Sequence, residues 1–307
     1  MIRESQIENI HRRLCDRIEI LGAISSSSEG LTRVFLSKEM DIASRLIQSW
    51  MNTAGLVSDI DPFQNVIGSW PSSTAKTPSI HIGSHYDTVV DAGKYDGVLG
   101  VLLSIAAIEL LQAEGYVPKH HINALAFCDE EGVRFQTTFL GSSLLCGTFD
   151  DSNLDKVDSE GIDMRSALNA RGFDPDSVAD VAPIIGEDDV FLEAHIEQGP
   201  VLEASDHPLG VVTAVAAQTR IGITVTGKAG HAGTTPHDLR KDALACAAEM
   251  VLAVERFAAI HPEAKATVGK LDVSPNASNA IPGKSHFSID FRAPSLGQLR
   301  ELSLIHI

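Results

Sequence analysis

The sequence has little of the material from which a disulfide scaffold or a membrane protein is built. Only four of its 307 residues are cysteines, at positions 15, 128, 146 and 246, and no two of them form a CxxC pair. This usage predicts buried free thiols in a reducing, cytoplasmic environment. The longest apolar run, Val98 to Ile108, is too short to span a bilayer. The charged first residues also lack the apolar stretch of a signal peptide.

Basic residues are scarce as well. The chain has 24 Lys and Arg against 41 Asp and Glu, which gives a formal net charge of −17. Because nucleic-acid phosphates need a basic protein surface, this balance excludes nucleic acid as an expected partner. At 307 residues, the chain is long enough for more than one domain and a large core.

Three apolar, strand-like segments each run into histidine or acidic residues. They are residues 79–83 followed by His85, Asp87 and Asp96, residues 122–127 followed by Glu130 and Glu131, and residues 190–194 followed by His195. Open α/β sheets carry their chemistry at the carboxyl ends of their strands. Histidine nitrogen and carboxylate oxygen are ligands that divalent transition metals accept. One such turn alone fits a solvated polar loop equally well, but three in order indicate a metal site.

Four longer motifs contain these residues. They are GSHYDTVVDAGKYDGVLGV, FCDEEGVRFQTTFLGS, FLEAHIEQGPVLE and GKAGHAGTTPHDLRKDAL. Together they resemble the zinc-dependent amidase/hydantoinase/carbamoylase branch of the aminoacylase and carboxypeptidase superfamily. That branch includes N-carbamoyl-L-amino-acid hydrolases, β-ureidopropionases and allantoate amidohydrolases. The resemblance implies an α/β fold like that of the metallo-exopeptidases: a mixed sheet with helices on both faces, plus an inserted α+β lid.

The resemblance also implies a domain organisation. We expect a catalytic metal-binding domain over residues 1–213 and a lid and dimerisation domain over residues 214–307. Both are incomplete against the family pattern, in which relatives continue with the rest of the lid and a last metal-binding histidine. His306 has no matching context and is not assigned that role. We therefore expect the chain as it stands to bind at most one zinc firmly, to be prone to aggregation and to hydrolyse carbamoyl amino acids at no useful rate.

Local patterns predict individual elements. Apolar residues at helical spacing indicate a helix over residues 2–21, and a second helix is expected from Ser37, as its N-cap, to Ala54. A strand pair with a turn at Asp61 and Pro62 follows. Relatives usually have glycine where this chain has Gln64, a departure for which we expect no consequence.

The resemblance implies two divalent metal ions, with zinc favoured and manganese, nickel or cobalt as alternatives. Asp96 would bridge the two ions. His85 and His195 would complete the protein ligands of one ion, and Glu131 would bind the other.

Two further residues would support this centre. Asp87 would accept the second ring N–H of His85 and so fix its tautomer. Glu130 would be the general base that takes a proton from the attacking water. A solvated acidic pair is the alternative interpretation of Glu130 and Glu131.

Substrate contacts are implied at four positions. His231 would donate a hydrogen bond to the developing oxyanion, within one chain or across a dimer. Arg292, with Asn279 beside it, would bind a substrate carboxylate, and Gln198 would contact the substrate. A salt bridge at a strand edge is the alternative for Arg292.

The expected function is hydrolysis of a linear carbamoyl or ureido C–N bond in an N-carbamoyl amino acid or in allantoate. The partners would be a small carboxylate-bearing substrate and a second copy bound through the lid, without a membrane. One alternative is a dipeptidase or aminoacylase-type amide hydrolase on the same fold. Another is an inactive chain that acts only as a dimerising or binding module, which metal content would distinguish from an enzyme.

Overall fold

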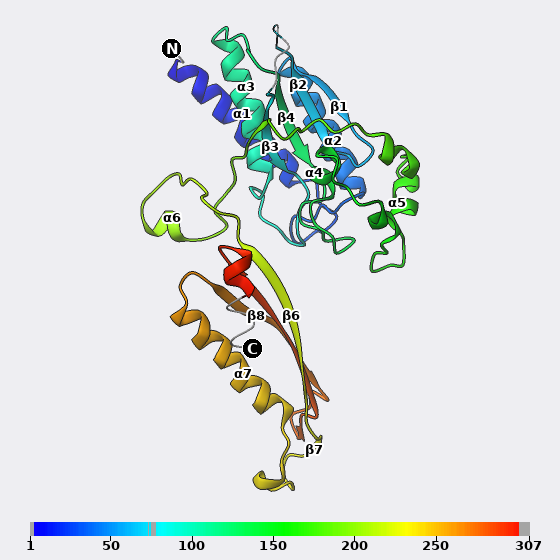
Figure 1. The fold of residues 1–307 in the computed structure, drawn as a ribbon, viewed down its shortest axis with the longest axis vertical. Coiled ribbons are helices and arrows are strands. Elements are labelled where there is room, and N and C mark those ends of the chain that lie inside the picture. The colour runs from blue at the N-terminus through cyan, green and yellow to red at the C-terminus, as the bar shows by residue number, and fades with distance from the viewer. Residues whose placement is uncertain (1–2, 73, 75–77, 301–307) are drawn as a thin grey trace. The chain divides into compact units, whose positions relative to one another are not determined.

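The computed structural model describes residues 3–72, 74 and 78–300. The chain divides into two compact units, Met1–Ala204 and Ser205–Ile307 (Figure 1). This division falls before residue 213, after which we expected the lid to begin. Residues 205–216 form neither helix nor strand and precede the first strand of the second unit. His306 lies outside the described residues.

A mixed five-stranded sheet forms the frame of the first unit. Its strands are β1 (Val57–Ile60), β2 (Val66–Trp70), β3 (Ile80–His85), β4 (Ile122–Phe127) and β5 (Val190–Leu192). Their order is β1-β2-β4-β3-β5. The first two pairs are antiparallel, and β3 runs parallel to both β4 and β5. The carboxyl ends of these three parallel strands therefore lie along one edge of the sheet.

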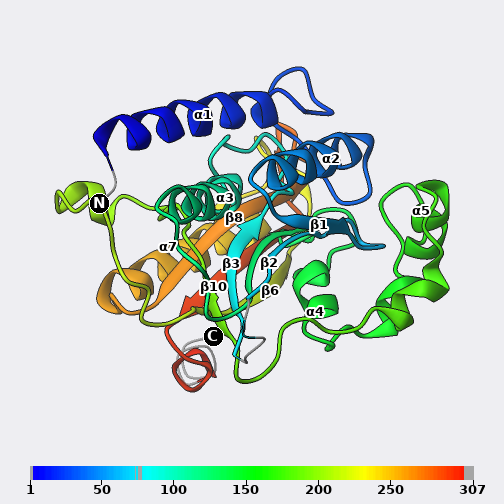
Figure 2. The same ribbon diagram turned by 90° about the horizontal axis from the view of Figure 1, so that it is seen from above.

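Helices cover both faces of this sheet. The helices of this unit are α1 (Glu4–Gly22), α2 (Lys38–Thr53), α3 (Val98–Ala113), α4 (Leu140–Leu145), α5 (Met164–Ala170) and α6 (Val201–Ala204), with short 3-10 helices η1 (Asp151–Asp155) and η2 (Pro175–Asp180). Helices α2 and α3 pack on the sheet and α1 packs on α3 (Figure 2). Along β4, Ala124 and Ala126 belong to the main core, whereas Leu125 and Phe127 pack with Leu145 of α4. This two-sided arrangement confirms the predicted fold class.

Local chemistry explains where α2 begins and ends. The Ser37 hydroxyl accepts a hydrogen bond from the Met40 amide at 3.2 Å, which confirms the predicted N-cap. After the helix, Gly55 has a φ of +76°, a left-handed conformation that glycine adopts without strain.

The turn between β1 and β2 is organised by Asp61. Its Oδ1 accepts the amide N–H groups of Phe63 and Asn65, each at 2.9 Å. Gln64 within this turn has a φ of +74°. This backbone conformation favours glycine, which explains why relatives usually have glycine at this position. Our expectation that this departure has no consequence was wrong, because a side chain at this φ is strained. The Gln64 side chain donates a hydrogen bond to Asp41.

The second unit is a smaller α+β arrangement. Its elements are β6 (Ala217–Thr226), β7 (Gly230–His231), η3 (His237–Leu239), α7 (Ala243–Ile260), β8 (Lys265–Ser274), β9 (Ala280–Ile281) and β10 (Lys284–Ala293). An antiparallel sheet has the order β6-β10-β8, and β7 pairs with β9 in a separate ribbon. Phe287, Ile289 and Phe291 of β10 are buried in a core to which Val254 of α7 also belongs. In the described part of the chain, no helix combines the length and apolar character needed to cross a membrane.

Candidate metal centre

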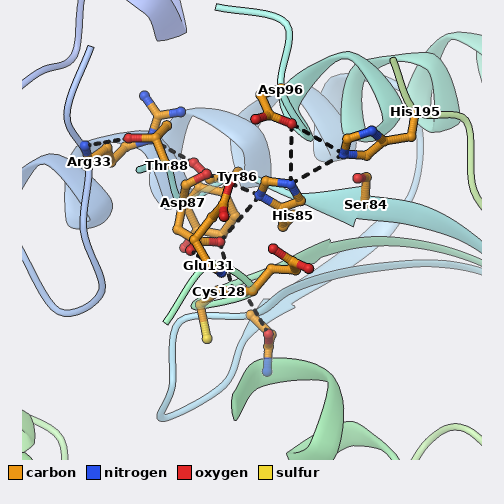
Figure 3. A network of polar contacts seen from close by, with 12 residues as sticks. Arg33, Ser84, His85, Tyr86, Asp87, Thr88, Asp96, Cys128, Glu131 and His195 are labelled. Atoms are coloured by element: carbon orange, nitrogen blue, oxygen red, sulfur yellow. Dashed lines mark hydrogen bonds and ion pairs between the residues drawn. The ribbon is translucent and has the colours of Figure 1, made fainter. Parts of the chain in front are cut away.

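Three side chains from separate segments meet at the edge of the first unit's sheet. His85 ends β3, Asp96 precedes α3 and His195 follows β5. The Nε2 atoms of His85 and His195 are 3.4 Å apart, and they lie 3.8 and 3.4 Å from Oδ1 of Asp96 (Figure 3). The three predicted ligands of one metal are therefore brought together.

The hydrogen bonds of the two rings determine which nitrogen faces the centre. Nδ1 of His85 donates to the main-chain carbonyl of Asp87 at 3.1 Å, and Nδ1 of His195 donates to the carbonyl of Ile196 at 2.8 Å. Since a carbonyl oxygen only accepts, each neutral ring carries its hydrogen on Nδ1. When both rings are neutral, as metal binding requires, both Nε2 lone pairs therefore point toward each other and toward the Asp96 carboxylate, an arrangement that a cation between them stabilises.

The spacing of these atoms fits zinc. Tetrahedral zinc with bonds of about 2.0–2.1 Å holds its ligand atoms roughly 3.3–3.4 Å apart. Two of the three separations are 3.4 Å and the third is 3.8 Å. Two imidazoles and one carboxylate are also a common zinc ligand set. The residues present therefore fit a bound divalent ion.

Glu130 and Glu131 lie beside this centre, just past the end of β4. His85, Glu130 and Glu131 each offer one ligand atom, and these atoms lie within 4.8 Å of one another. His85 thus belongs to both candidate ligand groups. That Glu131 binds a second metal together with Asp96 stays a prediction.

Asp87 connects these two groups. The residue is 1% exposed, and its two side-chain oxygens accept the amide N–H groups of Glu130 at 3.0 Å and Glu131 at 3.1 Å. Its Oδ1 also lies 3.4 Å from Nδ1 of His85. We expected the Asp87 carboxylate to accept the ring N–H of His85. The main-chain carbonyl of Asp87 is the nearer acceptor, so the main chain and the side chain of Asp87 share this role. The sequence did not predict that Asp87 also holds the Glu130–Glu131 turn.

The environment shifts the proton affinity of these groups. Burial raises the pKa of Glu130, and the negative charges of Asp87 and Glu193 raise it further, against the opposing effect of His85 and His195. Burial alone would lower the pKa of His85. The hydrogen bond and negative charge of Asp87 outweigh it, helped by Glu130, and raise the pKa of His85 to about 9.

A buried arginine, not predicted from the sequence, supports the same loop. Arg33 is 0% exposed, and its Nε donates to the carbonyl of Tyr86 at 2.8 Å. Its main-chain N–H donates to the hydroxyl of Thr88 at 2.8 Å. Burial lowers the pKa of Arg33 to about 10. Arg33 therefore stabilises the conformation of Tyr86 and Thr88, in the segment that follows His85.

Gln198 contacts the candidate ligand set directly. Its Nε2 donates to both carboxylate oxygens of Asp96, at 2.8 and 3.0 Å. This residue was predicted as a substrate contact, and in the structure its amide is engaged with Asp96. A substrate contact by Gln198 stays a prediction.

In the second unit, His231 and Asn279 lie side by side. The amide of Ala232 donates to the main-chain carbonyl of Asn279 at 3.0 Å, in the ribbon formed by β7 and β9. Nδ1 of His231 accepts the Gly233 N–H at 3.1 Å, so Nε2 of the neutral ring carries the hydrogen. This tautomer can donate a hydrogen bond, as the predicted role requires.

Arg292 lies elsewhere in the second unit. It pairs in register with Gln218 at the start of β6, whereas Lys284, at the other end of β10, pairs with Thr226. At about 3.4 Å per residue, the strand carries Arg292 roughly 27 Å from Lys284. Figure 1 shows β7 at that opposite end of the unit. The structure therefore does not place Asn279 beside Arg292, contrary to our expectation.

The Arg292 guanidinium is engaged in an ion pair. Its Nε donates to Asp290 at 2.8 Å, and the same carboxylate lies 3.5 Å from Arg220. These hydrogen bonds raise the pKa of Arg292. The alternative interpretation, a salt bridge on a strand, is thus what the structure contains, although Arg292 stays exposed.

Comparison with known proteins agrees with this fold and site. The strand-end centre and mixed sheet are those of a metallohydrolase, and the model of the peptidase family M20/M25/M40 matches residues 81–287. The chain belongs to this family, whose members generally bind divalent metals.

Similar proteins within the family include N-carbamoyl-L-amino-acid and allantoate hydrolases. The chain is 40% identical over 285 residues to an N-carbamoyl-L-amino-acid amidohydrolase of Pseudomonas sp., covering 91% of this chain and 69% of that protein. It is 38% identical to an allantoate deiminase of Arabidopsis thaliana, covering 90% and 57%. A hydantoinase/carbamoylase family amidase from Burkholderia ambifaria has a TM-score of 0.82 at 33% identity, covering 95% and 72%. The resemblance seen in the four motifs is confirmed, and the chain spans 57–69% of the length of these two curated relatives.

Proposed function

We propose that the chain carries the site of a metal-dependent amidohydrolase that cleaves a linear carbamoyl or ureido C–N bond. The substrate would be an N-carbamoyl amino acid or allantoate. The observation that carries this proposal is the convergence of His85, Asp96 and His195 at zinc-like spacing, with Glu130 beside them. The relatives named as N-carbamoyl-amino-acid and allantoate hydrolases support the bond that is cleaved.

Two divalent ions complete the proposed centre, with zinc favoured. His85, Asp96 and His195 would hold one ion, and Asp96 with Glu131 would contribute to the second. When bound, such ions polarise the scissile carbonyl and acidify the attacking water.

Glu130 would move the proton. Its carboxylate is not among the three ligands of the first ion. Its raised pKa lies closer to neutral pH, and a group with such a pKa can both accept a proton from water and release it to the leaving nitrogen. Asp87 holds the amide of Glu130 and so orients it. The proton would pass from the attacking water to a Glu130 oxygen and then to the leaving nitrogen.

The substrate carboxylate would be bound by Arg292, and the oxyanion by His231. Because these residues lie at opposite ends of one unit, one copy does not present both to the same small substrate. We therefore propose that the active protein is a homodimer in which the two copies contribute different groups of the lid. Asp290 would release or share Arg292 when a substrate carboxylate arrives.

A dipeptidase or aminoacylase-type activity is the second candidate. It is favoured by the match to a family of peptidases. It differs from the first candidate in the acyl group, because a peptide or N-acyl substrate releases no ammonia.

The test is a substrate panel with metal-loaded protein at high concentration, since four assigned ligands for two ions imply slow turnover. We expect ammonia from N-carbamoyl amino acids or allantoate, and no cleavage of dipeptides or N-acyl amino acids. The Glu130→Gln variant should keep its metal and lose about 10²–10⁴-fold in rate, because only proton transfer is removed. Cleavage of dipeptides alone, or near-normal turnover by Glu130→Gln, contradicts the proposal.

A further inference from the structure

The strand pairing that leads toward His195 ends before it reaches the centre. β5 pairs with β3 from Val190 to Leu192, and the last pair in register is Ile82 with Leu192. His195 lies beyond this last pair, in a segment without regular secondary structure. Something other than the strand ladder must therefore hold His195 against His85.

A side-chain hydrogen bond joins the two segments just past the last strand pair. The Ser84 hydroxyl donates to Oε1 of Glu193 at 2.5 Å. Ser84 is 0% exposed within β3, whereas Glu193 is exposed. Hydrogen bonds to a carboxylate are among the stronger ones in proteins. The buried strand thus holds the exposed segment two residues before His195.

Helix α3 packs on the same point. A Cβ atom added at Gly100 would lie 2.1 Å from the carbonyl oxygen of Ala194 and 2.7 Å from Cβ of Ser84. Only a glycine lets the helix approach the segment this closely. Ala194, which lies between Glu193 and His195 in the chain, therefore has little room to shift.

The segment is also held on the other side of His195. Gln198 donates to Asp96 at 2.8 and 3.0 Å. Between these two attachments, the His195 ring stacks on His85 with a centroid distance of 5.6 Å and an interplanar angle of 28°. Figure 3 shows Ser84 on the same side of the cluster as His195.

We propose that Ser84, acting through Glu193, is a positioning residue that sets His195 for metal binding. The inference rests on the proposed metal centre. Without the Ser84–Glu193 hydrogen bond, the segment that carries His195 loses its attachment on one side, and more of the metal-binding free energy is spent on ordering it.

The test measures zinc affinity of the whole chain by competition with a chromogenic chelator. Ser84→Ala should raise the Kd of the tighter zinc site about 10–100-fold, the usual effect of losing a residue that orients a metal ligand. Ser104→Ala is the matched control, because Ser104 is equally buried but donates to the Val101 carbonyl within α3. Its zinc affinity should equal that of the wild type.

Glu193 provides an independent pair of variants at an exposed position. Glu193→Ala should weaken zinc as Ser84→Ala does, whereas Glu193→Gln keeps an acceptor for the Ser84 hydroxyl and should restore most of the affinity. With cobalt in place of zinc, the visible spectrum of Ser84→Ala and Glu193→Ala should shift toward that of His195→Ala. A purely structural role of Ser84 would change stability without this spectral shift.

Wild-type affinity in both Ser84→Ala and Glu193→Ala overturns this inference and leaves the metal centre intact. Equal losses in Glu193→Gln and Glu193→Ala also overturn it, because charge rather than the hydrogen bond would then be responsible. A wild-type chain that binds no zinc overturns the proposed metal centre and this inference with it.

Discussion

Replacing Asp87 by asparagine should change the proton affinity of His85 in the metal-free protein. Asp87 is buried, its Oδ1 lies 3.4 Å from Nδ1 of His85, and its hydrogen bond and charge outweigh burial to raise the pKa of His85 to about 9. Asparagine removes the negative charge and puts a donor in place of one acceptor. Burial is then opposed only by the smaller effects of Glu130 and the main-chain carbonyl of residue 87, so the pKa of His85 should fall well below about 9.

The magnitude follows from the shift of this pKa. A rise from 6.5 to about 9 corresponds to roughly 3 kcal/mol at about 1.36 kcal/mol per unit. Because the folded pKa lies above the unfolded one, this stability is fully present below about pH 6.5 and is lost as the pH rises through about 9. In Asp87→Asn the difference in unfolding free energy between those two pH values should lack this contribution.

The assay is an NMR titration of the His85 ring in chelator-treated protein, with urea unfolding at both ends of the range. Asp189→Asn is the control, because Asp189 pairs with His81 at 3.1 Å and no effect of it on His85 is expected. A wild-type His85 that titrates at or below about pH 6.5 refutes the reasoning. So does an Asp87→Asn variant in which His85 still titrates near pH 9.

Three further predictions concern packing, substrate binding and a second buried carboxylate. Gly100→Ala would place its Cβ 2.1 Å from the Ala194 carbonyl and should cost about 1–3 kcal/mol in urea unfolding, whereas Gly93→Ala, with open space around it, should change stability by less than about 0.5 kcal/mol. Arg292→Lys should raise KM for carbamoyl substrates about tenfold with kcat little changed, since lysine lacks the two-pronged donor; an equal fall in kcat contradicts the assignment. Burial raises the pKa of Asp61 to about 6. The protonated Asp61 side chain therefore contributes roughly 3 kcal/mol of stability below about pH 4, and this contribution is lost as the pH rises through 6. A difference in unfolding free energy between wild type and Asp61→Asn that does not change with pH would contradict this prediction.

The sequence predicted the parts of the site that depend on order along the chain. Apolar strands followed by His85, Glu130 and His195 place these residues at one sheet edge, because parallel strands share the direction of their carboxyl ends. The predicted α2 N-cap at Ser37 was also correct, since capping depends on residues within one turn.

The features that the sequence did not predict depend on contacts between distant segments. Ser84 and Glu193 lie far apart in the chain, and a serine inside an apolar strand suggests only a buried polar group with an unknown partner. The same holds for Arg33, whose hydrogen bonds go to main-chain carbonyls that any residue supplies. The separation of Arg292 from Asn279 was missed because strand length and register decide it, not the spacing of motifs.

The most direct test of the central claim is X-ray absorption at the zinc edge on the chain loaded with one equivalent of zinc. We expect two imidazole nitrogens and carboxylate oxygen at about 2.0–2.1 Å, from His85, His195 and Asp96. One imidazole should be lost in His195→Ala. A zinc ion with fewer than two imidazoles in the wild type, or an unchanged spectrum in His195→Ala, would contradict the account.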